Sequence, residues 1–163
     1  MKRYKPSERK KAGRETPLAR KLKAVIDTNL FVSGLFGSDT ISARIQDYWI
    51  NLDFVLVTSI DIIKEVNRVF HYPRIQERFN PDEENIKRFF RLIFRKALIT
   101  KDIYKTDRIT DDPTDNKFLA CALEGEADYV VSRDSHLRNL KHYHGIQIVD
   151  ASTFVSKVTG KEK

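Results

Sequence analysis

Short apolar runs alternate along this chain with longer segments in which apolar residues recur every three or four positions. The first run, Ala24 to Ile26, lacks an alternation of apolar and polar residues, which is the pattern of a strand covered on both faces of a parallel sheet. The runs fall at residues 24–26, 54–57, 98–99, 127–132 and 146–149. The sequence therefore predicts a set of buried parallel strands.

The segments between these runs have the 3.6-residue period of amphipathic helices. They cover residues 30–36, 41–49, 62–70, 81–97, 115–123 and 151–158, and a further short helix begins near residue 134. Strands that alternate with helices in this way form a parallel sheet with helices on both faces. We therefore expect an α/β fold, a three-layer α/β/α sandwich with a central, mainly parallel sheet.

Polar residues with the chemistry of helix N-caps precede several of these helices. Ser, Thr, Asn and Asp are preferred at that position because their side chains accept a hydrogen bond from a free backbone N–H. Thr58 or Ser59 is expected to cap the helix 62–70, and Thr114 is expected to cap the helix 115–123. Asn80 is expected to cap the helix 81–97, because Pro81 then stands at the first helical position.

The length and composition predict one folded domain. The chain has 163 residues, 40% of them hydrophobic, which is enough for a single buried core. It has no apolar run of the roughly 20 residues that a membrane span needs, and no secretory signal is visible, so a cytoplasmic protein without membrane contact is expected. Its single cysteine, Cys121, lies in an apolar helix and is expected in the core.

The net charge of +7 is confined to the amino-terminal tail. Residues 1–22 contain nine Lys and Arg against two Glu, so the remainder of the chain is neutral. We expect this basic tail to be disordered, either as a phosphate-binding arm or as a solubilising extension. One folded domain is expected over residues 23–159, with residues 160–163 as a short carboxyl-terminal tail.

Four acids stand where the predicted strands end or the following helices begin. Asp27 ends the first strand and Asp134 follows the strand 127–132, although either could simply cap a helix. Glu65 lies at the border of an apolar helix face, where it could equally be a solvated side chain. Asp115 lies on the apolar face of its helix, where an ionised carboxylate needs a partner. Asp112 is a weaker fifth candidate.

The parallel topology would bring these four acids to one edge of the sheet, where ligands bind in open α/β folds. Neighbouring carboxylates remain ionised together only with a cation between them. A cluster of oxygen ligands without Cys favours Mg²⁺ or Mn²⁺, and such ions support phosphodiester hydrolysis. Thr28, Asn29 and Ser132 could hold the carboxylates in orientation.

Four segments together resemble the PIN domain, and they are most similar to its bacterial and archaeal branch of toxin–antitoxin toxins. The resemblance extends over about residues 23–158 and rests on residues 25–33, Glu65, residues 112–123 and residues 127–134. It implies a ribonuclease dependent on Mg²⁺ or Mn²⁺, with Asp27, Glu65, Asp115 and Asp134 as catalytic metal ligands. The toxin branch also implies an RNA substrate, a cognate antitoxin and a homodimer.

One triplet departs from the pattern of the resembled family, which often has Thr-Gly-Asp where this chain has Ser132-Arg133-Asp134. Arg133 could contact an RNA phosphate, or its bulk could narrow the mouth of the site. Lys87, Arg91 and Arg95 on the helix 81–97 are further candidates for RNA contacts, although such residues more often form a solvated helix face.

Two other classes of function compete with the nuclease. The first is a non-catalytic RNA-binding module that keeps the PIN fold. The second is a phosphatase or phospho-receiver domain, which the sequence disfavours. An aspartyl phosphatase has a second Asp two residues after its nucleophile, and position 29 is Asn here. A receiver domain has a lysine at the end of its last strand, where this chain has Val149 and Asp150.

Overall fold

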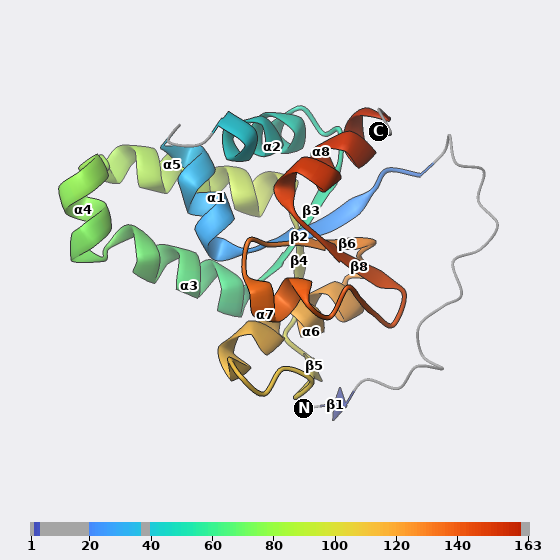
Figure 1. The fold of residues 1–163 in the computed structure, drawn as a ribbon. Coiled ribbons are helices and arrows are strands. Elements are labelled where there is room, and N and C mark those ends of the chain that lie inside the picture. The colour runs from blue at the N-terminus through green and yellow to red at the C-terminus, as the bar shows by residue number, and fades with distance from the viewer. Residues whose placement is uncertain (1, 4–19, 37–39, 161–163) are drawn as a thin grey trace.

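A six-stranded sheet forms the centre of the molecule (Figure 1). The computed structural model describes residues 2–3, 20–36 and 40–160. The strand order is β4-β3-β2-β6-β8-β7, and every neighbouring pair is parallel except β7 with β8. The strands are β2 (Lys23–Ile26), β3 (Val55–Ser59), β4 (Leu98–Thr100), β6 (Tyr129–Val131), β7 (His142–Tyr143) and β8 (Ile146–Val149).

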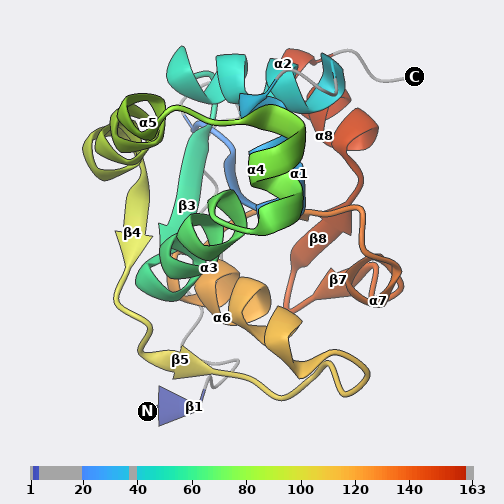
Figure 2. The ribbon, with the colours of Figure 1, turned by 90° about the vertical axis from the view of Figure 1, so that its left-hand side faces the viewer.

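Helices cover both faces of this sheet, so the predicted three-layer α/β/α architecture is confirmed (Figures 1 and 2). One face is covered by α6, which contacts β2, β3 and β6. On the other face α1 packs on α2, and α2 packs on α8. The helices are α1 (Thr28–Leu35), α2 (Thr40–Ile50), α3 (Ile60–Phe70), α4 (Pro73–Phe79), α5 (Glu83–Lys96), α6 (Asn116–Glu124), α7 (Ser135–Arg138) and α8 (Ala151–Thr159).

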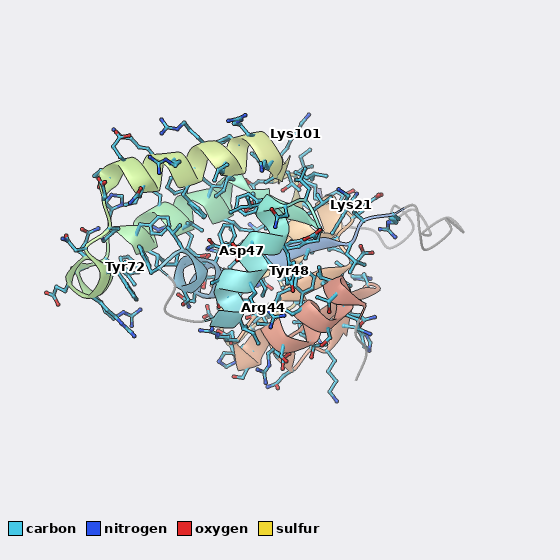
Figure 3. All side chains as sticks on the ribbon, turned by 90° about the horizontal axis from the view of Figure 1, so that it is seen from above. Lys21, Arg44, Asp47, Tyr48, Tyr72 and Lys101 are labelled. Carbon is cyan, nitrogen blue, oxygen red and sulfur yellow. The ribbon has the colours of Figure 1, made fainter. Side chains whose placement is uncertain are left out.

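Aromatic side chains join the helices of the second face. Phe89 of α5 lies 5.1 Å from Phe31 of α1 and 5.5 Å from Phe70 of α3, measured between ring centroids. Trp49 of α2 contacts both Phe31 and Phe89. Figure 3 shows α2 between α5 and α8, with Arg44, Asp47 and Tyr48 on its outer side. These aromatic contacts hold α1, α2, α3 and α5 together on one face of the sheet.

Two of the predicted helix caps are wrong. Asp82, and not Asn80, caps α5, because its Oδ1 accepts a hydrogen bond from the backbone N–H of Glu84 at 3.1 Å. Asn80 instead ends α4 in the left-handed conformation, with φ of 41°, which Asn tolerates better than most residues. Thr114 does not cap α6, because Asp112 caps a preceding 3₁₀ turn at Pro113–Asp115.

Short elements that the apolar pattern did not predict include α4, β7 and β5 (Tyr104–Lys105). The last of these pairs in parallel with β1 (Lys2–Arg3). Near the start of β2, the Arg20 guanidinium forms an ion pair with Asp128 at 3.1 Å. The predictions of a disordered tail and of a tail after residue 160 fall mainly on residues 4–19 and 161–163, which lie outside the described residues.

No helix within the described ranges combines the length and the apolar character that crossing a lipid bilayer would require.

Candidate active site

The central strands deliver Asp27 and Asp134 to the same edge of the sheet. Strands β2 and β6 are parallel neighbours, with Ile26 opposite Val131. Asp27 directly follows β2, and its backbone N–H donates to the Val131 carbonyl at 2.9 Å. Asp134 lies three residues after Val131 and caps α7. This edge is the carboxyl end of the strands, where open α/β sheets bind ligands.

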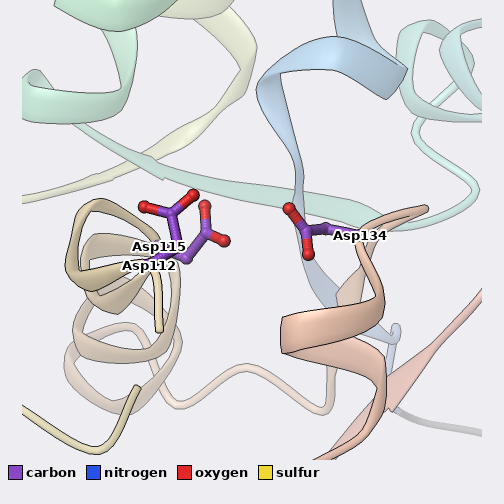
Figure 4. Close-up of side chains that lie close together, drawn as sticks. All are labelled: Asp112, Asp115 and Asp134. Carbon is purple, nitrogen blue, oxygen red and sulfur yellow. The ribbon is translucent and has the colours of Figure 1, made fainter. Parts of the chain in front are cut away.

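Asp112, Asp115 and Asp134 form the tightest group of acids at this edge. One carboxylate oxygen from each lies within 4.8 Å of the others. Figure 4 shows Asp112 and Asp115, from the turn before α6, facing Asp134 at the start of α7. Asp112 therefore belongs to the centre of the acid group, although the sequence had given it only a supporting place.

Asp115 carries a polar atom that the fold leaves without a partner. The residue is 9% exposed, and its buried Oδ2 accepts no hydrogen bond from any residue that the structure describes. Burial, which is the largest cause, and the neighbouring charges of Asp112, Asp134, Asp27 and Glu65 together raise the pKa of this carboxyl to about 7. A buried carboxylate of this kind is stabilised by a bound cation or by a proton.

Asp27 serves as a helix cap and as a member of the acid group at once. Its Oδ1 accepts a hydrogen bond from the Asn29 N–H at 3.4 Å, and its Oδ2 accepts one from the Ser132 hydroxyl at 2.6 Å. The same hydroxyl oxygen accepts a hydrogen bond from the Asp134 N–H at 2.9 Å. Burial raises the pKa of Asp27, and the charges of Glu65 and Asp134 raise it further against the hydrogen bonds. Ser132 therefore links the two strand-end acids.

Glu65 reaches the same edge from α3 and is held on both of its oxygens. Thr28, next to Asp27, donates its hydroxyl hydrogen bond to Oε2. The Lys117 ammonium lies 3.1 Å from Oε1, with both side chains largely buried. The predicted orienting residues thus contact acids of the group, Thr28 and Ser132 through their hydroxyls and Asn29 through its backbone N–H. Their orienting role stays a prediction.

Sequence reasoning missed Lys117. This residue stands at the beginning of α6, where the helix dipole disfavours a positive charge. A lysine in a first helical turn is therefore a signal that an acid lies nearby, and Glu65 is that acid here.

The basic residues singled out from the sequence do not gather around the acids. The Arg133 guanidinium donates to the Ser42 hydroxyl of α2 at 3.0 Å. Lys87, Arg91 and Arg95 are exposed on α5, whose side chains project outward along one side of the molecule (Figure 3). Because α5 leads through Ala97 into the amino end of β4, its last turn lies at the sheet edge opposite the acids. RNA contacts by these residues stay a prediction.

The donor set fits a hard divalent cation. It consists of carboxylate oxygens with hydroxyl support. Within the part of the chain that the structure describes, it includes the unpartnered Asp115 Oδ2 and contains no thiol or imidazole. Oxygen ligands of this kind suit Mg²⁺ or Mn²⁺. One of the four predicted acids, Glu65, is already paired with a lysine, so the arrangement favours Asp112, Asp115 and Asp134 as the residues that could hold a cation. Asp27 lies near enough for its charge to raise the pKa of Asp115.

Comparison with known proteins supports this assignment of the fold. A solved structure, PAE2754 from Pyrobaculum aerophilum, superposes with a TM-score of 0.53 over 86% of this chain and 90% of its own, at 12% sequence identity. This similarity concerns the fold alone. In sequence, the uncharacterized protein MJ1680 from Methanocaldococcus jannaschii is 27% identical over 121 residues, which is 74% of this chain and 76% of that protein.

The sequence profile of the PIN domain matches residues 23–136, which span the strands and helices that carry every acid of the group. PIN domains have a nuclease-type fold and are generally nucleases. The chain therefore belongs to the PIN domain family.

Proposed function

We propose that this protein is an endoribonuclease that hydrolyses RNA phosphodiesters with the help of Mg²⁺ or Mn²⁺. The observation that carries the proposal is the buried, unpartnered Asp115 Oδ2 beside Asp112 and Asp134 in a PIN domain. Among the described residues, no backbone N–H or side chain donates a hydrogen bond to this oxygen, which supports a role as a cation ligand.

The acids have distinct tasks in this proposal. Asp112, Asp115 and Asp134 would hold the cation, with Asp27 fixed beside them by Ser132. When bound, such an ion activates a water molecule and neutralises charge on the attacked phosphate. Glu65, oriented by Thr28 and Lys117, would accept a hydrogen bond from the attacking water and align it. The Lys117 ammonium would also offset part of the negative charge that the phosphate meets on entering the site.

The test is cleavage of single-stranded RNA by the purified full chain. We expect hydrolysis with Mg²⁺ or Mn²⁺, none with a chelator, and a loss of about 100-fold or more in Asp27→Asn, because the site loses a charge that counts for several kcal/mol in such centres. Asp47→Asn on the outer side of α2 is the matched control and should cleave as the wild type does. Equal cleavage by wild type and Asp27→Asn would reject the proposal.

The non-catalytic RNA-binding module remains the second candidate. The Glu65–Lys117 ion pair favours it, because it satisfies one acid of the group without any metal. This alternative predicts RNA binding without turnover under either metal, and binding that survives replacement of Asp27, Asp115 and Asp134 by Asn.

The toxin-type role is a finer part of the proposal. It implies a cytoplasmic RNA target, a cognate antitoxin protein and a homodimer. Expression of the wild-type chain in a bacterial host should arrest growth, and Asp27→Asn should not. Growth at an equal rate with both chains would reject the toxin role and leave the nuclease proposal to the cleavage assay.

A further inference from the structure

A small cavity lies between α1, α3 and α4, and Asn29, two residues after Asp27, forms part of its lining. Its volume is about 290 Å³, and its polar lining consists of Asn29, Ser33, Arg74 and Arg78. Asn29 connects it with the acid group, because the Asn29 N–H donates to Asp27. The cavity therefore shares Asn29 with the acid group and extends from there to α4.

The charge of this cavity is positive and not neutralised. Arg74 and Arg78 are exposed, and neither forms an ion pair with any residue in the described part of the chain. The cavity on the α6 side of the acids differs, because its lining includes Asp61 and Asp102 as well as Arg68, Lys105 and Lys117. Of these two flanking cavities, only the one at α4 has basic residues without acids.

The remaining lining of the α4 cavity is apolar. Val32, Val69, Ile75 and Phe79 form it. Phe79 stacks on Phe36 with 4.5 Å between ring centroids, and the Arg78 guanidinium lies 5.0 Å from the Phe79 ring centroid. A guanidinium held over an aromatic face is pre-organised, while its N–H groups remain free to donate to an anion.

We propose that this cavity is a nucleotide-binding subsite for single-stranded RNA, in which Arg74 and Arg78 bind phosphate and the apolar floor receives a base. Its size suits one nucleotide and excludes a duplex, whose bases are not free to enter. In single-stranded RNA, the phosphates can bind the two arginines while an unstacked base packs on the apolar floor. The inference rests on the proposed function, because it supplies the substrate path to the acids.

The test measures RNA binding separately from cleavage. In the full chain carrying Asp27→Asn, which keeps the RNA intact, the double substitution Arg74→Ala with Arg78→Ala should weaken binding of a short single-stranded RNA roughly tenfold. The slope of log affinity against log salt should fall in magnitude by about 1.4, which corresponds to two phosphate contacts on a single strand. Fluorescence anisotropy at several salt concentrations gives both quantities.

The matched control removes the same charge from α2 and α8. Arg44→Ala with Lys157→Ala should leave the affinity and the salt slope unchanged, because both residues are exposed and belong to helices that line neither of the two cavities. In the cleaving enzyme, the Arg74 and Arg78 variant should raise KM with kcat retained, which a loss of fold would not produce.

Equal weakening by the two double variants, or none by the α4 variant, would overturn the subsite. Loss of binding by the α4 variant in a protein that never cleaves RNA would keep the subsite and reject the nuclease proposal. RNA cleavage with unchanged KM in the α4 variant would keep the nuclease proposal and reject the subsite.

Discussion

At the residue scale, Ser132 shows how one hydroxyl organises two acids. It is fully buried, donates to Asp27 and accepts from the backbone of Asp134. The acids lie far apart in sequence, yet a single side chain sets the orientation of one and the backbone position of the other. Such support commonly changes metal affinity as much as some ligands do.

We expect Ser132→Ala to lower the affinity for Mg²⁺ or Mn²⁺ about 10- to 100-fold, because the Asp27 carboxylate loses the hydrogen bond that orients it. Isothermal titration with Mn²⁺ measures this affinity. Ser156→Ala, which removes a hydroxyl that bonds only within α8, is the control. An unchanged affinity in Ser132→Ala would mean that Asp27 is oriented by other groups.

At the element scale, the close approach of α1 and α2 holds the amino end of α1, and with it Asp27 and Asn29, over the sheet edge. Gly34 of α1 lies against the backbone of α2, and a Cβ at this position would meet the Ser42 carbonyl oxygen at 2.6 Å. The Gln46 side chain of α2 also donates to the Phe31 carbonyl of α1 at 2.6 Å. The contact between α1 and α2 therefore requires a residue without a side chain at position 34.

Gly34→Ala should therefore lower the free energy of unfolding by about 1 to 3 kcal/mol, since the obstructing atoms are backbone and the two helices must move apart. Chemical denaturation followed by circular dichroism measures the change. Gly160→Ala is the comparison, because a Cβ there meets open space and only the left-handed backbone is strained. A larger loss in Gly160→Ala than in Gly34→Ala would contradict the contact.

At the scale of the whole molecule, the acid group joins distant parts of the chain. Its members come from the end of β2, the turn before α6 and the start of α7, with Glu65 from α3. Any ion bound there ties these elements together and stabilises the folded state by mass action. The pKa of Asp115, raised to about 7 by burial and by its neighbours, couples this stabilisation to pH.

The sign of this coupling follows from the proton that Asp115 keeps in the folded state. Its pKa rises from 3.8 to about 7 on folding, so without metal its contribution makes the protein less stable as pH increases from about 4 to about 7. Asp115→Asn should abolish this part of the slope in thermal unfolding experiments. Identical pH profiles of the two proteins would show that Asp115 is not buried as described.

Divalent ions must displace the same proton, so they should raise the melting temperature more at pH 8 than at pH 6. The apparent affinity should improve roughly tenfold per pH unit below 7 and level off above it. Asp115→Asn should lose most of the metal-dependent shift at both pH values. A shift that is larger at pH 6 would exclude Asp115 as a ligand.

Much of the fold could be predicted because it follows from local chemistry. The spacing of apolar residues predicts buried strands such as 24–26 and 146–149, and it predicts the helix at 60–70. Ser59 and Asp134 cap helices through their side-chain oxygens, as Ser and Asp commonly do. The caps at Asn80 and Thr114 were misassigned because a neighbouring Asp, one or two residues away, competes for the same role.

The sequence by itself determined that acids at the ends of parallel strands would come to one edge, because alternating strands and helices leave few other topologies. Only the tertiary structure decided that Lys117 pairs with Glu65 and that Asp112 joins Asp115 and Asp134. It also decided that Arg74 and Arg78 share a cavity with Asn29, while the last turn of α5 lies at the opposite sheet edge. Periodicity reports which face of an element is buried. The choice of neighbours depends on contacts between side chains far apart in sequence, which have no local signature.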